Sequence, residues 1–245
     1  MMTTVTYDEI GVTYAALRAP DPQIASAITA ALGDARSVVN VGAGTGSYEP
    51  AGRRVIAVEP SKKMIAQRAA GSALAVQAVA AALPFADAVF DAAMAVLTVH
   101  HWADIGAGLA ELRRVTTGPI VLLTFDPAAR PWLTDYLPEL ATLDDAQFPR
   151  ITDYAQWLGA VSIAPVPVPH DCRDGFLYAY WRRPTAYLDP HIRSGSSSFW
   201  AIGDAGAGLA RLADDLHSGD WARRYADLVA AETYDAGYRL VVAQQ

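Results

Sequence analysis

The sequence predicts an α/β protein built on a parallel, doubly wound β-sheet. A short β-branched run, Val38–Val41, is long enough for one buried strand and is followed by a turn rich in glycine. A second apolar run, Val55–Val58, ends in the acid Glu59. Three more apolar runs alternate with helical patterns before residue 126. This alternation is typical of parallel sheets that carry helices on both faces.

The glycine turn and the acid after the second run predict a nucleoside pocket. Gly42, Gly44 and Gly46 place three residues without Cβ atoms close together. Such a turn adopts positive φ and lets a ligand approach the backbone. A carboxylate at the tip of the next strand, here Glu59, can accept hydrogen bonds from both hydroxyls of a ribose. The pocket is expected at the carboxyl ends of the strands.

The spacing of the glycines separates two classes of nucleotide-binding protein. The dinucleotide fingerprint is G-x-G-x-x-G, and its third glycine would fall at Ser47. The observed spacing is G-x-G-x-G, which weighs against a nicotinamide-dependent oxidoreductase without excluding it. A purely structural turn in an α/β fold is the remaining alternative.

The amino-acid composition excludes several classes of partner and site. The chain has 245 residues, is 52% hydrophobic and carries a formal net charge of −7, which suits one α/β domain with an added lobe. The acidic balance argues against nucleic acid as a partner. The single cysteine, Cys172, excludes an internal disulfide and a thiolate zinc site, and no metal site is predicted. No signal peptide or membrane-spanning run is found, so we expect a cytoplasmic protein without membrane contact.

The elements before residue 126 follow in order. Residues 7–18 have helical spacing, and we expect either a lid carrying Tyr14 or a surface helix in which this tyrosine packs locally. Asp21 and Ser61 are suitable N-caps for the helices that follow them, and Asp104 for a third. The expected helices cover residues 22–32, 62–68 and 105–115, and the remaining strands residues 73–79, 90–97 and 120–125.

A long insertion, residues 127–220, follows the fifth strand. Residues 153–161 have helical spacing, and Val161–Val168 predicts an edge strand because prolines interrupt it. Its later part holds Tyr180, Trp181 and Arg182, which either clamp an anionic or aromatic molecule or fill the core of the lobe. Residues 194–198 predict a loop. An amphipathic helix over residues 220–230 and a strand over 237–243 end the chain.

Five motifs in order make the chain resemble small bacterial class I S-adenosylmethionine (SAM) methyltransferases of the ubiquinone-biosynthesis and trans-aconitate type. The motifs are Val38–Gly46, Val58–Ser61, Leu83–Phe85, Phe90-Asp91 and Leu97–Trp102. The resemblance implies a Rossmann-like, seven-stranded sheet, mostly parallel with an antiparallel terminal strand, plus a cap insertion. It divides the chain into a SAM-binding core with a lid helix (1–126), a substrate cap with part of the sheet edge (127–220) and a helix and strand that complete the core (221–245).

The resemblance also assigns roles to residues. The glycine turn would lie against the amino-acid end of SAM, Glu59 would hold the ribose, and Pro60, Ser61 and the Leu83 turn would lie around the adenine. The acid that the family often has near Ala81 is missing. The implied SAM-binding residues are Tyr14, Gly42, Ala43, Gly44, Gly46, Glu59, Pro60, Ser61, Ala81, Leu83 and Leu97.

Methyl transfer from SAM asks the protein mainly to align a nucleophile with the methyl group and to exclude water. His100 and His101 follow the fourth strand, on the side of the cofactor pocket, and either could accept a proton from the acceptor. Alternatively, one histidine bonds to the backbone and Trp102 packs on the next helix.

The expected function is in-line methyl transfer to a small molecule, with Trp102, Tyr180, Trp181 and Arg182 contacting it. A SAM-binding regulator or complex subunit without transfer activity stays open, and the acceptor and the oligomeric state are not predicted.

Overall fold

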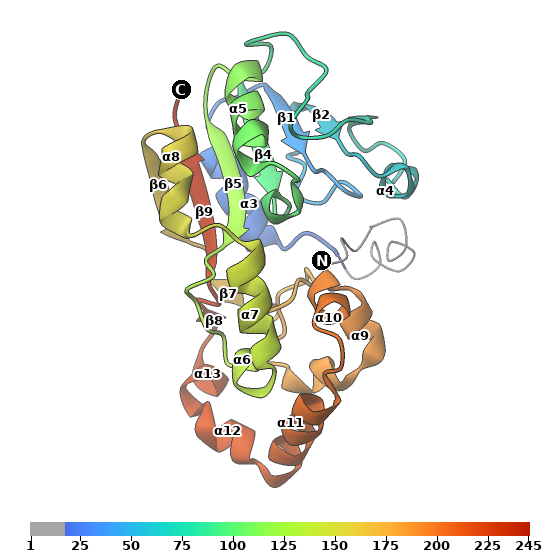
Figure 1. Cartoon of the computed structure of the whole chain (residues 1–245), viewed down its shortest axis with the longest axis vertical. Helices are drawn as coiled ribbons and strands as arrows, with labels where there is room; N and C mark the ends of the chain where they lie inside the picture. The colour runs from blue at the N-terminus through green and yellow to red at the C-terminus, as the bar shows by residue number, and fades with distance from the viewer. Residues whose placement is uncertain (1–17) are drawn as a thin grey trace.

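The computed structural model describes residues 18–245. The expected lid helix and Tyr14 lie outside these residues. Figure 1 shows the β-sheet at one end of the molecule and a group of helices, drawn from residues 133–147 and 190–230, at the other. We call this group the helical lobe. Within residues 18–245 no helix is long and apolar enough to cross a bilayer.

The central sheet has the seven strands that were predicted, and their order is β3-β2-β1-β4-β5-β9-β6. β1 to β5 are parallel, and β9 runs antiparallel to both β5 and β6. β6 belongs to the insertion and forms one edge of the sheet, which confirms the predicted edge strand. The strands are β1 (Ser37–Val41), β2 (Arg54–Val58), β3 (Leu74–Val76), β4 (Ala92–Val96), β5 (Ile120–Phe125), β6 (Val161–Pro165) and β9 (Tyr238–Ala243).

Two hydrophobic clusters cover the faces of the sheet. Successive residues of a strand point to opposite faces, so Val38 packs with α3 (Pro22–Ala31) and Val39 with α5 (Ile105–Val115) and α8 (Tyr154–Leu158). The predicted caps are confirmed, because the side chains of Asp21, Ser61 and Asp104 each accept a backbone hydrogen bond from the first turn of their helix. Because β1, β2 and β4 are parallel, their carboxyl ends lie at one edge of the sheet.

The cluster on the α3 face continues into the helical lobe, so one apolar core serves both. It joins Ile24 of α3 to Phe125 of β5 and then to Trp132, Trp181 and other buried aromatic residues of the insertion. The lobe and its connections contain α6 (Leu133–Tyr136), α7 (Pro138–Gln147), β7 (Val168–Pro169), η3 (Pro184–Leu188), α9 (Pro190–Ser194), α10 (Ser197–Ala201), α11 (Gly206–Ser218) and β8 (Thr233–Tyr234).

Several predicted elements differ from the structure. The strand expected over 73–79 is limited to β3, and α4 covers only Lys62–Ala66. The tail helix expected over 220–230 is wrong as one element: it breaks into α12 (Asp220–Arg224) and α13 (Ala226–Ala230) at Tyr225. The hydroxyl of Tyr225 donates to Asp135 and its ring packs on Trp132, so these tertiary contacts favour a non-helical backbone at this residue. The sequence analysis also missed α11.

A buried polar network joins the sheet to the insertion. Asp174, which is fully buried, accepts hydrogen bonds from the guanidinium of Arg18 and, at 2.9 Å, from the hydroxyl of Tyr48. The hydroxyl of Ser47, next to the glycine turn, donates to the carbonyl of Arg18 at 3.2 Å. The turn after β1 and the insertion are therefore held in one arrangement.

Candidate active site

The glycine turn has the conformation that its sequence predicts. Gly42, Gly44 and Gly46 have φ values of 73°, 52° and 99°, in the left-handed region that favours glycine. The amides of Gly42 and Ala43 donate to the carbonyl of Val58 at 2.8 and 3.0 Å, which closes the turn onto the end of β2. A Cβ atom on Gly42 would collide with the side chain of Thr98.

Glu59 lies between the glycine turn and the start of α4. Its carboxylate accepts hydrogen bonds from the amide of Gly44 at 2.8 Å and from the amide of Ser61 at 2.9 Å. The residue is buried at 7% exposure. A carboxylate is a hydrogen-bond acceptor, which is the chemistry that a ribose diol needs. The acid lies directly after β2, beside the glycine turn that follows β1.

The predicted adenine side of the pocket is built from the turn after β3. Ala81 is exposed, and Leu83 is buried with its amide donating to a Glu111 carboxylate oxygen at 2.8 Å. Arg114 binds the same carboxylate, and this contact is the main cause that lowers the pKa of Glu111. Glu111 therefore braces the turn and does not replace the acid that is missing near Ala81. Pro60 lies exposed beside Ser61, with its carbonyl bound by Gln77.

His100 and His101 form a short 3-10 helix, η1 (Val99–His101), directly after β4. Their rings lie 3.8 Å apart between centroids, and the ring of His100 stacks on Phe148 at 4.1 Å. In the described part of the chain, the buried Nδ1 of His100 has no hydrogen-bond partner. Burial and then His101 and Arg18 lower the pKa of His100 well below its usual range, and burial and then Arg18 lower the pKa of His101 to about 4. Both imidazoles are neutral at pH 7.

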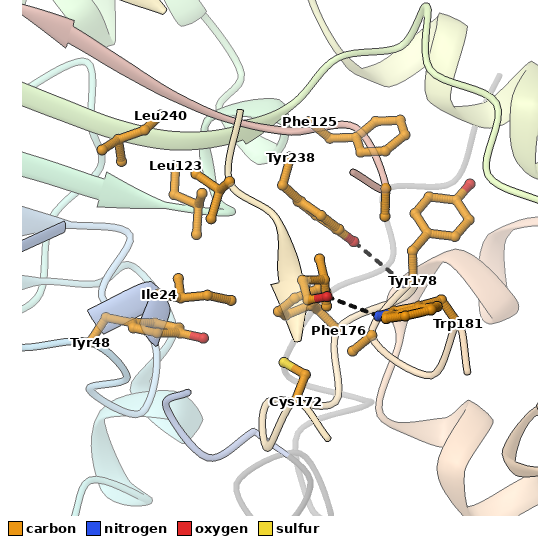
Figure 2. Close-up of a cluster of buried hydrophobic side chains, with 14 of the residues drawn as sticks. Ile24, Tyr48, Leu123, Phe125, Cys172, Phe176, Tyr178, Trp181, Tyr238 and Leu240 are labelled. Atoms are coloured by element: carbon orange, nitrogen blue, oxygen red, sulfur yellow. Dashed lines mark hydrogen bonds between the residues drawn. The ribbon is translucent and has the colours of Figure 1, made fainter. Parts of the chain in front are cut away.

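A cavity of about 60 Å³ opens beside the histidines. It has room for a few water molecules or for the small end group of a ligand. Figure 2 shows three of its aromatic walls, Phe125, Tyr178 and Tyr238, lying together where β5 and β9 meet the insertion. Residues 195–198, which were predicted as a loop, line the cavity at the junction of α9 and α10. The other lining residues are Arg18, Leu97, His100, His101, Asp144, Phe148, Phe176 and Leu177.

Asp144 is the acid of this cavity, and the sequence analysis missed it. It is 2% exposed and accepts a hydrogen bond from the hydroxyl of Tyr178 at 2.6 Å. Burial raises its pKa to about 6, against the lowering effect of the Tyr178 hydrogen bond and of Arg130. One signal was present in the sequence: Asp144 lies four residues after Leu140, so a helix over this segment places both on its buried face.

The predicted substrate residues lie outside the described lining of this cavity. Trp102 packs over Gly108 of α5. Trp181 is a core residue of the insertion, and its indole N–H donates to the carbonyl of Val168 at 3.0 Å, the bond drawn in Figure 2. Arg182 binds the carbonyl of Ala231 and the carboxylate of Glu232, and Tyr180 stacks with Arg183. Trp102 thus packs beside α5, and the aromatic and hydrogen-bonding groups of the other three are engaged within the insertion and with residues 231 and 232.

Comparison with known proteins identifies the family. The model of a methyltransferase domain family matches residues 39–118. A solved structure named as a methyltransferase from an antibiotic biosynthesis pathway of Anabaena variabilis ATCC 29413 is 34% identical, with a TM-score of 0.86 over 94% of this chain and 99% of that one. The chain belongs to the class I SAM-dependent methyltransferase family. SAM is the cofactor of this family, and the positive-φ glycine turn beside a buried carboxylate fits it.

Two further comparisons are more distant. The Escherichia coli (strain K12) protein YafE, named as uncharacterized, is 30% identical over 121 residues, a match that spans 46% of this methyltransferase and 58% of YafE. The geranyl diphosphate C-methyltransferase from Streptomyces coelicolor A3(2) is 14% identical with a TM-score of 0.53, over 90% of this chain and 76% of that one. The second comparison shows the fold alone.

Replacing Gly42 by alanine tests whether the turn has to be free of side chains. Gly42→Ala adds a Cβ that meets the short, branched Thr98 side chain, and it forces alanine to positive φ. Gly33→Ala is the matched control, because Gly33 has φ 56° and nothing near a Cβ. Both should lose about 1–2 kcal/mol of stability from backbone strain. Only Gly42→Ala should also lose S-adenosylhomocysteine affinity in isothermal titration calorimetry, by more than about tenfold, roughly the equivalent of 1.4 kcal/mol. Equal affinities in the two variants would contradict the assignment of the turn.

The raised pKa of Asp144 predicts a pH-dependent cost to stability. Because the folded pKa, about 6, lies above the ordinary value of 3.8, the carboxyl contributes fully to stability only below that ordinary value. The contribution is lost as the pH rises through about 6. Between pH 4 and pH 7 the wild type should lose about 2 kcal/mol of free energy of unfolding relative to Asp144→Asn, at 1.36 kcal/mol per pKa unit, because the unfolded carboxyl is already more than half ionised at pH 4. Urea denaturation across this range measures it, and a pH-independent difference would argue against the raised pKa.

Proposed function

We propose that the protein transfers the methyl group of SAM to a small-molecule acceptor whose reacting atom enters the cavity beside His100 and His101. The observation that carries this proposal is the path of residues 97–101. Thr98 lies against Gly42 of the glycine turn, while Leu97, His100 and His101 line the cavity. One short segment thus borders both the expected cofactor crevice and the cavity, as a direct transfer between two ligands requires.

The proposed SAM-binding groups follow from the geometry around the turn. The backbone of Gly42–Gly46 would contact the amino-acid end, the Glu59 carboxylate the ribose hydroxyls, and Pro60, Ser61, Ala81 and Leu83 the adenine. Tyr14, outside the described residues, remains a predicted cover for this site. When bound, SAM supplies a methyl group activated by a sulfonium sulfur.

The residues of the chain contribute alignment, exclusion of water and proton acceptance. The aromatic walls of the cavity leave room for little besides the acceptor's end group, which favours an in-line approach and keeps water out. Neutral His100 and His101 have a lone pair at pH 7 and can accept a proton or a hydrogen bond from the acceptor. Their lowered pKa values make them weak bases, so we expect positioning of the acceptor to outweigh proton transfer.

A SAM-binding protein without transfer activity is the second candidate, and activity measurements separate the two. The buried, unpartnered Nδ1 of His100 favours an enzyme, because a polar atom without a partner in a cavity is accounted for when an acceptor binds there. The nicotinamide-dependent alternative is not retained, given the family. The division at residues 126 and 220 and the cytoplasmic location remain predictions from the sequence.

Glu59→Gln tests the ribose contact. The amide replaces one carboxylate oxygen by an N–H group, which cannot accept from Gly44 or Ser61 and offers a weaker partner to a diol. Losing a hydrogen bond to a charged group costs about 1.5–3 kcal/mol, which corresponds to roughly 10- to 100-fold in affinity for S-adenosylhomocysteine. Isothermal titration calorimetry measures this change, with the exposed Glu139→Gln as control. Unchanged affinity in Glu59→Gln would remove the assignment.

His100→Gln and His101→Gln test the histidines. Glutamine keeps a polar group but cannot take up a proton, and general-base catalysis typically contributes about 10²–10⁴-fold. We expect at least one of the two variants to lower kcat by at least tenfold. Its affinity for S-adenosylhomocysteine should stay at the wild-type level. Transfer of labelled methyl groups to the best acceptor of a metabolite panel provides the assay, with the exposed His191→Gln as control. Wild-type kcat in both variants would leave the histidines without a catalytic role.

A further inference from the structure

We propose that the acceptor is an amine and that Asp144 binds its nitrogen in the cavity. The inference rests on the proposed methyl transfer and deepens it by naming the chemical class of the acceptor. Three independent observations carry it: the charge that remains uncompensated in the cavity, the hydrogen-bonding groups that lack partners, and the aromatic walls.

The charges around the cavity leave Asp144 as the group to be matched. Arg18 lines the cavity, but its guanidinium is paired with the buried Asp174. Arg130, which also influences Asp144, is paired with Asp145 at 2.8 Å. Among the residues that the structure describes, the other titratable groups lining the cavity are the two neutral histidines and the hydroxyls of Tyr178 and Tyr238. A cationic nitrogen would neutralise the negative charge of Asp144, whereas a carboxylate would place a second negative charge beside it.

Two hydrogen-bond acceptors in the cavity that have no partner among the described residues also favour an amine. Oδ2 of Asp144 accepts the Tyr178 hydroxyl, and in the described chain no hydrogen bond reaches its other oxygen, Oδ1. Nδ1 of His100, in the same cavity, is buried without a partner. A carboxylate oxygen is always an acceptor, and an imidazole nitrogen is one in the appropriate tautomer. An amine nitrogen carries enough hydrogens to serve two acceptors, whereas an alcohol has one and a carboxylate has none.

The walls favour a cation as well. Phe125, Phe148, Phe176 and Tyr178 line the cavity, and Phe125 and Tyr178 lie 5.3 Å apart between ring centroids (Figure 2). Aromatic faces attract ammonium groups, more strongly when water is excluded. The small volume admits a nitrogen and its nearest carbons, so the rest of the acceptor extends toward the residues at the junction of α9 and α10.

The reaction at such a nitrogen balances without further reactants. The bound ammonium loses one proton to water, which frees the nitrogen lone pair. This pair forms the new bond to the methyl carbon while the bond from that carbon to sulfur breaks, and its electrons stay on sulfur. The products are an N-methylammonium and neutral S-adenosylhomocysteine. The positive charge therefore moves from sulfur to a nitrogen that Asp144 already contacts.

Matched ligands test the class of acceptor. Isothermal titration calorimetry of the wild-type complex with S-adenosylhomocysteine, at pH 7.5, compares benzylamine, benzyl alcohol and benzoate, which share a ring and differ in the end group. We expect benzylamine to bind at least tenfold more tightly than benzyl alcohol, and benzoate more weakly than either. If S-adenosylhomocysteine itself does not bind, the proposed function fails. If it binds and benzylamine has no advantage, only the amine assignment fails.

Variants locate the contact. Asp144→Asn should weaken benzylamine binding at least tenfold and leave S-adenosylhomocysteine and benzyl alcohol binding unchanged. Glu139→Gln, an exposed acid on the same helix, is the matched control and should bind benzylamine like the wild type. Equal benzylamine binding by Asp144→Asn and the wild type would overturn the proposal.

A second variant keeps the test decisive if Asp144→Asn does not fold. Tyr178→Phe keeps the ring and removes the hydroxyl that lowers the pKa of Asp144. The wild type should lose benzylamine binding as the pH falls through about 6. Tyr178→Phe should lose it at a higher pH, because its Asp144 takes up a proton earlier. An unchanged pH profile in this variant would also overturn the proposal.

Discussion

The buried carboxylate of Asp174 is the contact on which the arrangement of the molecule depends. It accepts from Arg18 at the entrance to α3 and from Tyr48 just after the glycine turn, while the residue itself lies in the insertion. Removing one partner of a buried ion pair costs about 3–5 kcal/mol, because the other charge remains without compensation. The network therefore opposes any movement of the insertion away from the turn. It also neutralises Arg18, and this leaves the cavity with a net negative character.

The two halves of the site are built by different means. On the cofactor side, backbone atoms define the shape: the glycines take positive φ, and Glu59 binds two backbone amides. On the proposed acceptor side, side chains from η1, β5, α7, β9 and the insertion define it, and these segments lie far apart in the sequence. Leu97, between the two halves, has φ 50°, a costly conformation for a residue with a side chain. This strained residue lies in the segment that borders both the proposed SAM site and the proposed acceptor site.

Burial has opposite effects on the two kinds of titratable group at the acceptor side. It lowers the pKa of His100 and His101 and raises that of Asp144, because in each case the charged form is the one that loses hydration. The histidines are consequently neutral acceptors at pH 7, while Asp144 keeps its charge at a cost to folding. Such a cost at a cavity is typical of a functional group, since a core position without a ligand is better served by an apolar residue.

The sequence alone predicted the parallel strands β1 to β5, the positive-φ glycine turn and the place of Glu59 directly after β2. Val38–Val41, the glycine spacing and Glu59 are contiguous or nearly so, and their conformations follow from local rules on β-branching, positive φ and strand ends. The seven-stranded sheet with its antiparallel terminal strand was predicted only from the family resemblance, because no local sequence pattern pairs β9 with β5. The acceptor side was decided by the tertiary structure. Trp181 and Arg182 have the composition of a binding clamp, yet their partners within the lobe lie 12 to 50 residues away in the chain. Asp144 lines the cavity together with Tyr178, which comes from another part of the insertion and donates a hydrogen bond to its carboxylate. Contacts between residues so far apart in the sequence depend on how the whole chain folds, and no local sequence pattern predicts them.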